Sequence, residues 1–137
     1  MQTAIIAQAD SLAAYIGELL RTWGLLGGRV VAGDRLLPLD PASVPVVICA
    51  SDNLEAGLRG PLLEYVRTGG SIVSFVPQGD WAQALGLMAP RPKPTPQRLR
   101  LTARPAAGLD GELLPVVGTV LEYDWPAGTE PIAYLST

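Results

Sequence analysis

An uninterrupted apolar run, Val46–Ala50 (VVICA), constrains the fold more than any other part of the sequence. The run is uncharged and rich in β-branched residues, and the polar residues Ser51, Asp52 and Asn53 follow it. A half-exposed strand would alternate apolar with polar residues, so this run is typical of a strand covered on both faces. The sequence therefore predicts a central strand with helices on both sides of its sheet.

Strand and helix patterns alternate around this run. Further strand patterns occupy Thr3–Ala7, Arg29–Ala32 and Ser71–Val76. Apolar residues at helical spacing lie between them. They are Leu12, Ile16, Leu19, Leu20 and Trp23 in a first helix, then Leu58, Leu62 and Val66, with Leu63 beside them, in a second. Because Pro61 lies inside this second pattern, we expect the helix to begin near Gly60. A short third helix is expected over Gly79–Leu85. This order predicts the α/β fold class, as a flavodoxin-like three-layer sandwich with a mostly parallel sheet.

The pattern changes after residue 87. Proline recurs at every second position from Pro90 to Pro96, which favours extended polyproline conformation. From residue 98 onward, apolar and polar residues alternate as in half-exposed strands, with glycines between them. We therefore expect one domain, 1–137, with an α/β body (1–87), a proline-rich connection (88–97) and a β-rich C-terminal extension (98–137). The end of the chain just after an apolar strand pattern suggests a piece of a longer protein.

The composition excludes several classes of protein. The 137 residues include no histidine and one cysteine, so a Ser-His-Asp triad, a histidine-ligated zinc site and an internal disulfide are excluded. With 10 Lys+Arg against 13 Asp+Glu, the net charge of −3 argues against nucleic-acid binding. The sequence contains neither a secretory signal pattern nor an apolar stretch of about 18 residues for a membrane span. We predict no metal, no cofactor and no membrane partner, with a cytoplasmic location by default.

Polar residues follow three of the predicted strands. Ligands bind open α/β sheets beyond the carboxyl ends of their strands. The candidate ligand-binding residues at this edge are Gln8, Asp10, Ser51, Asp52, Asn53, Gln78 and Asp80. Asp10 and Asp52 resemble the acidic site of receiver domains, in which carboxylates hold Mg²⁺. Asp10, Asp52 and Asp80 also fit helix N-caps, and capping is the interpretation we favour.

Two further sets of residues could carry chemistry. Cys49 lies inside the predicted central strand, where a cysteine acts as a small apolar residue. Glu122 and Asp124 are two positions apart in a strand pattern and therefore share a face. A pair of carboxylates could do acid/base work, although two solvated strand residues is the interpretation that we favour.

A family resemblance is carried by residues 62–75 (LLEYVRTGGSIVSF). This segment resembles the helix, Gly-Gly, strand segment of class I glutamine amidotransferase-like domains, including the trehalose-utilisation and beta-galactosidase-trimerisation types. Residues 79–87 (GDWAQALGL) look like the helix that follows the nucleophile of that family. Residues 104–109 (RPAAGL) resemble its His-Pro…Gly-Leu segment more loosely, and Glu122-Tyr123 an acidic-Tyr pair.

The resemblance implies a domain that has lost its catalytic set. Active members place a cysteine on a tight strand-to-helix turn, and Pro77 stands at the matching position here. Arg104 replaces the histidine of the His-Pro segment. We therefore expect that the chain is not an enzyme. We expect an accessory domain for oligomerisation, interdomain packing or small-ligand binding, as part of a carbohydrate-active protein. The expected partner is a second copy or a neighbouring domain. The alternative is a hydrolase or a receiver-like phosphotransfer domain that uses the loop carboxylates.

Overall fold

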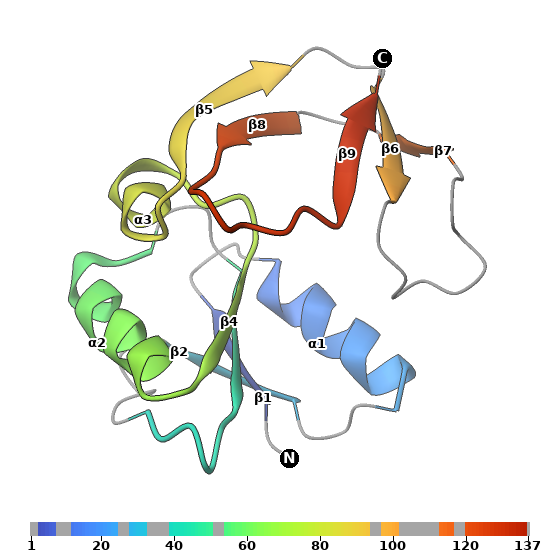
Figure 1. Cartoon of the computed structure of the whole chain (residues 1–137). Helices are drawn as coiled ribbons and strands as arrows, with labels where there is room; N and C mark the ends of the chain where they lie inside the picture. Colours follow the sequence, from blue (N-terminus) through green and yellow to red (C-terminus); the bar gives the residue numbers. More distant parts are fainter. Residues whose placement is uncertain are drawn as a thin grey trace. The chain divides into compact units, whose positions relative to one another are not determined.

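The structure is a computed structural model of the chain that describes residues 3–7, 12–24, 28–32, 39–50, 54–93, 97–101, 113–116 and 120–136. The chain divides into two compact units, residues 1–85 and residues 86–137 (Figure 1). Each unit has its own sheets, so each is described by itself.

The first unit is built on a parallel sheet of four strands in the order β2-β1-β3-β4. Its elements are β1 (Thr3–Ala7), α1 (Ala13–Thr22), β2 (Gly28–Ala32), β3 (Val46–Cys49), α2 (Ala56–Arg67), β4 (Ser71–Ser74) and α3 (Gly79–Ala84). The uncharged run of the sequence forms β3, which lies between β1 and β4, with Val47 opposite Ala4 and Ile72. Its predicted place inside the sheet is confirmed.

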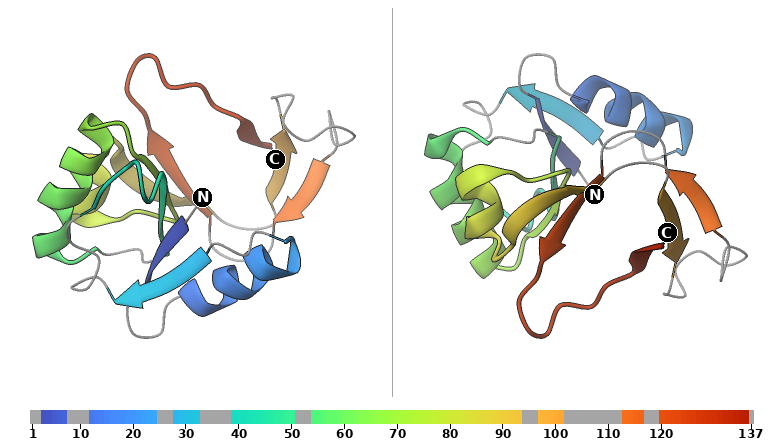
Figure 2. Two further views of the ribbon diagram at one scale, coloured as in Figure 1. Left: turned by 90° about the horizontal axis from the view of Figure 1, so that it is seen from below. Right: turned by 90° about the horizontal axis from the view of Figure 1, so that it is seen from above.

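Helices cover both faces of this sheet, with α1 and α2 on opposite sides (Figures 1 and 2). On one face, Ala13 and Ile16 of α1 pack against Ile5 and Ile48 of the strands. Helices α2 and α3 cover the other face. The buried core there consists of Ala4, Ile6, Val47, Cys49, Leu54, Leu58, Leu62, Tyr65 and Trp81. Neighbouring residues of β1 and β3 go to opposite faces, as the pleat of a strand requires.

Helix α1 buries only part of the apolar stripe that its sequence predicts. Of the apolar residues expected to face the core, only Ile16 is buried, whereas Leu12 is 47% and Trp23 is 72% exposed. The buried face combines Ile16 with Ala13 and Gly17, which lie at helical neighbour spacing. Because these two side chains are small, α1 can approach the sheet closely. Leu20 is partly buried against the same core, whereas Leu12 and Trp23 are left at the surface.

Helix α2 begins at Ala56, earlier than the predicted start near Gly60. Pro61 therefore lies inside the helix, where it removes one backbone hydrogen bond. The additional turn places Leu58 in the core beside Leu62. Burial of Leu58 offsets the loss at Pro61, so tertiary packing overrides the local preference.

The Gly-Gly pair ends α2 as predicted. Gly69 has a φ of +104°, a backbone conformation that favours glycine. The N–H of Gly69 donates to the carbonyl of Val66 (3.0 Å), and that of Gly70 donates to the carbonyl of Tyr65 (2.9 Å). These are the two bonds of a Schellman motif, which satisfies the last carbonyls of a helix. The chain then enters β4 directly at Ser71.

The second unit consists of strands in two antiparallel sheets, β5-β8 and β7-β6-β9. The strands are β5 (Met88–Lys93), β6 (Gln97–Leu101), β7 (Leu113–Val116), β8 (Val120–Asp124) and β9 (Ala133–Ser136). In β6, the exposed Arg98 and Arg100 alternate with the partly buried Leu99. The half-exposed strand predicted there is confirmed.

The predicted fold class is wrong for this chain. A flavodoxin-like sandwich has five parallel strands in one sheet, whereas the parallel sheet here has four, and the described residues contain three helices. After α3, the chain forms β5, which pairs antiparallel with β8 instead of extending the parallel sheet. Pro90 and Pro92 supply the physical reason, because proline has no N–H to donate within a central strand. Most of the described strands consequently belong to antiparallel sheets.

Candidate functional site

The turn that joins β4 to α3 is the most strained backbone described in the first unit. Val76 has a φ of +44°, and it is the non-glycine residue found at positive φ among the described residues. A β-branched side chain in this region costs about 1–3 kcal/mol, and such strain persists only where surrounding contacts impose it. Strained strand-to-helix turns are also where several enzyme families hold their nucleophile. The turn is therefore the strongest candidate for a catalytic position in this unit.

Two contacts hold this turn in place. The backbone N–H of Phe75 donates to the carbonyl of Cys49 in β3 (3.0 Å), so the chain stays in the sheet up to the turn. The indole Nε1 of the fully buried Trp81 donates to the hydroxyl of Ser74 (3.0 Å). The first turn of α3 is thereby fastened to the end of β4. Val76, between these anchors, is half exposed.

No nucleophilic group lies at the strained position. Val76 carries an unreactive alkyl side chain, and it precedes Pro77, where the family resemblance places the nucleophile. Nucleophilic catalysis requires an oxygen, sulfur or nitrogen group at such a position. Neither Val76 nor Pro77 supplies one.

Asp80 and Gln78 are the candidate ligand-binding residues that the structure describes. Gln78 is the N-cap residue of α3, and Asp80 lies in the first turn of that helix. Asp80 is thus not the N-cap that its sequence context predicts. Its carboxylate accepts a hydrogen bond from Arg59 Nη1 of α2 (2.8 Å), and Arg59 also donates through Nε to the carbonyl of Leu54 (3.1 Å). Asp80 therefore helps to tie α3 to α2.

The remaining candidate residues lie outside the described residues. They are Gln8, Asp10, Ser51, Asp52 and Asn53. Their convergence with Gln78 and Asp80 at one edge of the sheet stays a prediction. Within the described ranges, no group of three cysteine, aspartate or glutamate side chains could hold a metal ion.

Cys49 is fully buried in the core between α2 and the sheet. Burial raises the pKa of its thiol to about 12, because the thiolate would have to form away from water. A reactive cysteine requires the opposite environment, exposed and electropositive. The structural role that its sequence position predicts is confirmed in burial and packing.

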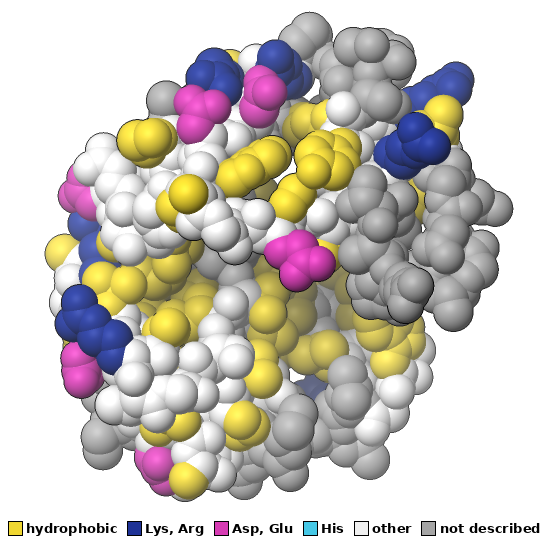
Figure 3. Space-filling view, viewed as in Figure 1, with side chains coloured by type: hydrophobic (Ala, Val, Ile, Leu, Met, Phe, Trp, Pro, Cys, Tyr) yellow, Lys and Arg dark blue, Asp and Glu magenta, His cyan; other side chains and the backbone are white. Residues whose placement is uncertain are grey.

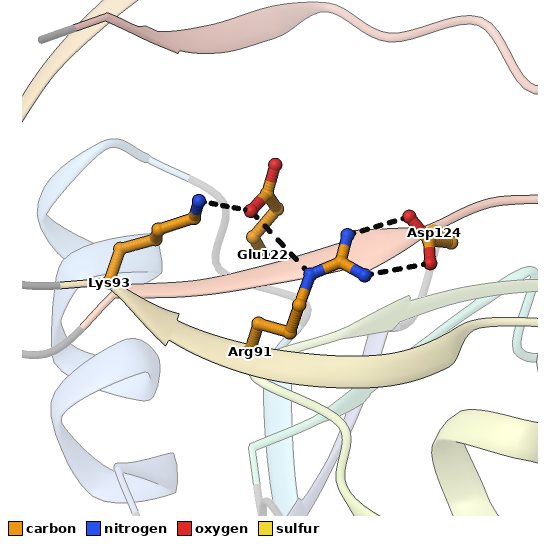
Figure 4. Close-up of polar contacts among 4 residues, drawn as sticks. All are labelled: Arg91, Lys93, Glu122 and Asp124. Carbon is orange, nitrogen blue, oxygen red and sulfur yellow. Dashed lines mark hydrogen bonds and ion pairs between the residues drawn. The ribbon is translucent and has the colours of Figure 1, made fainter.

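A cluster of charged side chains joins β5 to β8 in the second unit (Figure 4). Both guanidinium amino groups of Arg91 bind the carboxylate of Asp124 (Nη1–Oδ2 3.0 Å, Nη2–Oδ1 2.7 Å). Lys93 Nζ lies 2.7 Å from Glu122 Oε2, and Arg91 Nε lies 3.8 Å from the same oxygen. Figure 3 shows basic and acidic side chains side by side at the top, where β5 and β8 lie.

These ion pairs make Glu122 and Asp124 poor general acids. The hydrogen bond from Arg91 lowers the pKa of Asp124, and that from Lys93 lowers the pKa of Glu122. A general acid at neutral pH needs a raised pKa, which burial or a second carboxylate would provide. The two carboxylates share a face, as predicted, and each is occupied by a cation. The favoured interpretation as two solvated strand residues missed both cations.

Arg91 and Lys93 are the residues of this cluster that sequence reasoning overlooked. They lie in the segment predicted as a proline-rich connection, which hid their strand pattern. A signal was present, since Arg91 and Lys93 are two positions apart, the same spacing as Glu122 and Asp124. Matching period-two charges of opposite sign indicate cross-strand pairing.

Comparisons of the chain with models of protein families, with curated proteins and with solved structures found no match. No described helix has both the length and the apolar character that a bilayer crossing would need.

Proposed function

We propose that this protein is a non-catalytic association domain that works by binding a second copy of itself. The observation that carries the proposal is the turn after β4. The backbone of this turn is strained, as it is at the nucleophile of several enzyme families, but the side chain there is the half-exposed alkyl group of Val76. The carboxylate of Asp80, in the helix that follows, forms an ion pair with Arg59. The side chains on this part of the surface favour contact with apolar surface over bond-making chemistry.

Exposed apolar side chains of the first unit support the same proposal. They are Leu12, Tyr15, Trp23, Val66, Val73, Phe75 and Val76. Single exposed apolar residues are ordinary, but contiguous apolar surface marks interaction sites. Val73 and Phe75 are two positions apart and share a face of the β4 segment, and Val76 follows them in the turn, so the proposal concentrates on these three residues.

A relationship to class I glutamine amidotransferase-like domains is part of the proposal. Its support is the helix, Gly-Gly, strand segment, in which Gly69 and Gly70 have the helix-ending roles described above. In that setting, a domain without its nucleophile would keep its ability to associate.

The first test is the mass of the protein in solution. Sedimentation velocity and light scattering of the purified chain from about 1 to 200 μM should give a mass above that of one chain, increasing with concentration. A monomer over the whole range would contradict the proposal.

The second test is an activity assay with a control for the turn. Hydrolysis of glutamine and of activated esters should not exceed the rate in buffer. Turnover that is lost in Asp80→Asn, a variant that keeps size and shape but removes the charge, would show that the turn carries chemistry and would overturn the non-catalytic assignment.

A further inference from the structure

Strand β4 forms one edge of the parallel sheet. The N–H groups of Ser71 and Phe75 point to β3, where they donate to the carbonyls of Pro45 and Cys49 (3.0 Å each). Because backbone groups alternate sides along a strand, Ile72 and Ser74 direct their N–H and C=O groups to the outer side. No strand within the described residues pairs with that side. The outer side of β4 is thus a template for another strand.

This edge lacks the protection that several other edges among the described strands carry. Edge strands are commonly guarded by charged residues or by proline. The guards elsewhere are Arg91 and Lys93 with two prolines in β5, Glu122 and Asp124 in β8, and Pro115 in β7. The segment from Gly70 to Gly79 contains no charged residue, and proline enters it only after the strand has ended. Strand β9 is a second edge without a charged residue.

Val73 of β4 and Phe75, which follows the strand, are exposed on the sheet face that α1 covers elsewhere. Ile72 packs on the core beneath α2, and Ser74 binds Trp81, so both point to the α2 side. Val73 and Phe75 point the other way and are 45% and 38% exposed. Helix α1 covers β1 and β3 on that face but leaves these two side chains in contact with solvent.

We propose that a second copy of this chain binds here, by pairing its β4 antiparallel with β4 about a two-fold axis through Val73. The proposal rests on the association function proposed above and names the surface that performs it. In this arrangement the N–H of Ile72 donates to the carbonyl of the partner's Ser74, and the N–H of Ser74 donates to the carbonyl of the partner's Ile72. The axis repeats both bonds, so the outward-pointing groups of both strands are satisfied.

The side chains of β4 are complementary to themselves in this register. Val73 meets the partner's Val73 at a non-hydrogen-bonded site, where opposing Cα atoms lie about 4.5 Å apart and side chains are in closest contact. Large residues face small ones on either side, Phe75 opposite the partner's Ser71 and Ile72 opposite the partner's Ser74. No like charges oppose each other, because the strand has none. Identical patches that complement one another are what a two-fold interface requires.

Cross-linking tests the axis. Val73→Cys should form a disulfide-linked dimer within minutes under a mild oxidant such as diamide, since opposing Cβ atoms at such a site lie about 4.5–5.5 Å apart and small shifts allow a bond. Phe75→Cys is the matched control on the same face. Its own counterpart would lie about 13 Å away along the strand, so it should give at most about one tenth of the cross-linked product. Cys49 is buried and stays silent in both variants.

A charge on the edge provides the second test. Val73→Lys should weaken association at least about tenfold in sedimentation velocity, because the axis would bring two lysines together. Tyr134→Lys, on the uncharged edge β9, should leave association unchanged, and circular dichroism should show that both variants remain folded. Weakening by Tyr134→Lys alone would move the interface to β9 and overturn the proposal.

The outcomes separate this inference from the proposed function. If the unmodified chain is monomeric throughout, the association function itself fails. If the chain associates, but Val73→Cys does not cross-link and Val73→Lys does not dissociate it, association occurs through another surface, and only the β4 proposal is wrong.

Discussion

The aromatic ring of Tyr65 lies directly against the backbone of Gly70, so closely that a Cβ at position 70 would overlap ring atoms Cε1, Cε2 and Cζ. The hydroxyl of the same tyrosine donates to the carbonyl of Val44 (2.6 Å). One buried side chain therefore joins the end of α2, the entry to β4 and the segment before β3. The second glycine of the Gly-Gly pair is required by this contact, in addition to the helix-ending bond that it makes.

Gly70→Ala should destabilise the protein by about 1–3 kcal/mol, because the added methyl group overlaps the ring of Tyr65, which is buried and held by its hydrogen bond to Val44. Urea unfolding followed by fluorescence measures the change. Gly57→Ala is the matched control, since nothing lies within 4 Å of a Cβ there, the residue is helical and, unlike Gly60, it does not precede a proline. That variant should be stabilised by up to about 1 kcal/mol. Equal effects of the two substitutions would contradict the packing described here.

Tyr65→Phe should cost about 0.5–1.5 kcal/mol, because the carbonyl of Val44 loses its donor. Burial raises the pKa of the Tyr65 phenol, so the folded state favours its neutral form. The corresponding stability is fully present below the unfolded pKa of about 10 and is lost as the pH rises through the folded pKa. Unfolding curves between pH 8 and pH 11 should therefore fall less steeply with pH in Tyr65→Phe than in the parent protein. Parallel pH profiles would contradict the burial of this group.

Val76→Gly should stabilise the first unit by about 1 kcal/mol. The substitution removes strain of about 1–3 kcal/mol at φ +44°, and the greater freedom of glycine in the unfolded chain offsets part of the gain. Val73→Gly, only three residues earlier in β4, should be destabilising. Glycine weakens a strand because it has no side chain to pack and loses more backbone freedom on folding. Chemical denaturation should show changes in the free energy of unfolding of opposite sign for the two variants. A loss of stability in Val76→Gly would contradict the strain at this turn.

Cys49 should resist alkylation in the native protein. At pH 8, a thiol with a pKa of about 12 is almost entirely protonated, and its burial excludes the reagent. Mass spectrometry after treatment with iodoacetamide should show an unmodified chain in buffer and complete modification in 8 M urea. Rapid modification in buffer would place Cys49 outside the core.

Acid should destabilise the β5-β8 sheet through its carboxylates. The pKa values of Glu122 and Asp124 are lowered by Lys93 and Arg91, so their contribution is present above the unfolded values of about 4.3 and 3.9. It is lost as the pH falls through the folded values. Thermal unfolding between pH 2 and pH 6 should show this loss, and Arg91→Gln should reduce it, because the principal partner of Asp124 is then absent. High salt should weaken the same dependence, since these groups are exposed.

Local rules were sufficient to predict some features of the fold from the sequence. The position of β3 follows from an uncharged β-branched run, and the left-handed residue Gly69 follows from the ending of a helix. The buried face of α1 could not be predicted, because Ala13 and Gly17 face the core only when a sheet lies close by. In α2, the contacts of Leu58 outweigh Pro61, and a local pattern does not contain such long-range terms.

The site could be predicted only in part, for related reasons. Asp80 forms an ion pair with Arg59. Because Arg59 is distant in sequence, the residues around Asp80 could not indicate this partner. The left-handed backbone at Val76 opposes the preference of a β-branched residue, and the anchors at Ser74 and Phe75 impose it. Arg91 was missed because its alternation with proline resembles a polyproline segment.

The diagonal direction of the charge pairs has a consequence for how β5 aligns with β8. Arg91 lies opposite Glu122 but binds Asp124 most closely, and Lys93 lies opposite Val120 but binds Glu122. Both cations thus reach two positions along β8 in the same direction. Slippage by a single residue would turn both to the opposite face of the ribbon. The prolines remove backbone hydrogen-bond donors from β5. The four charged side chains therefore determine the register in which β5 pairs with β8.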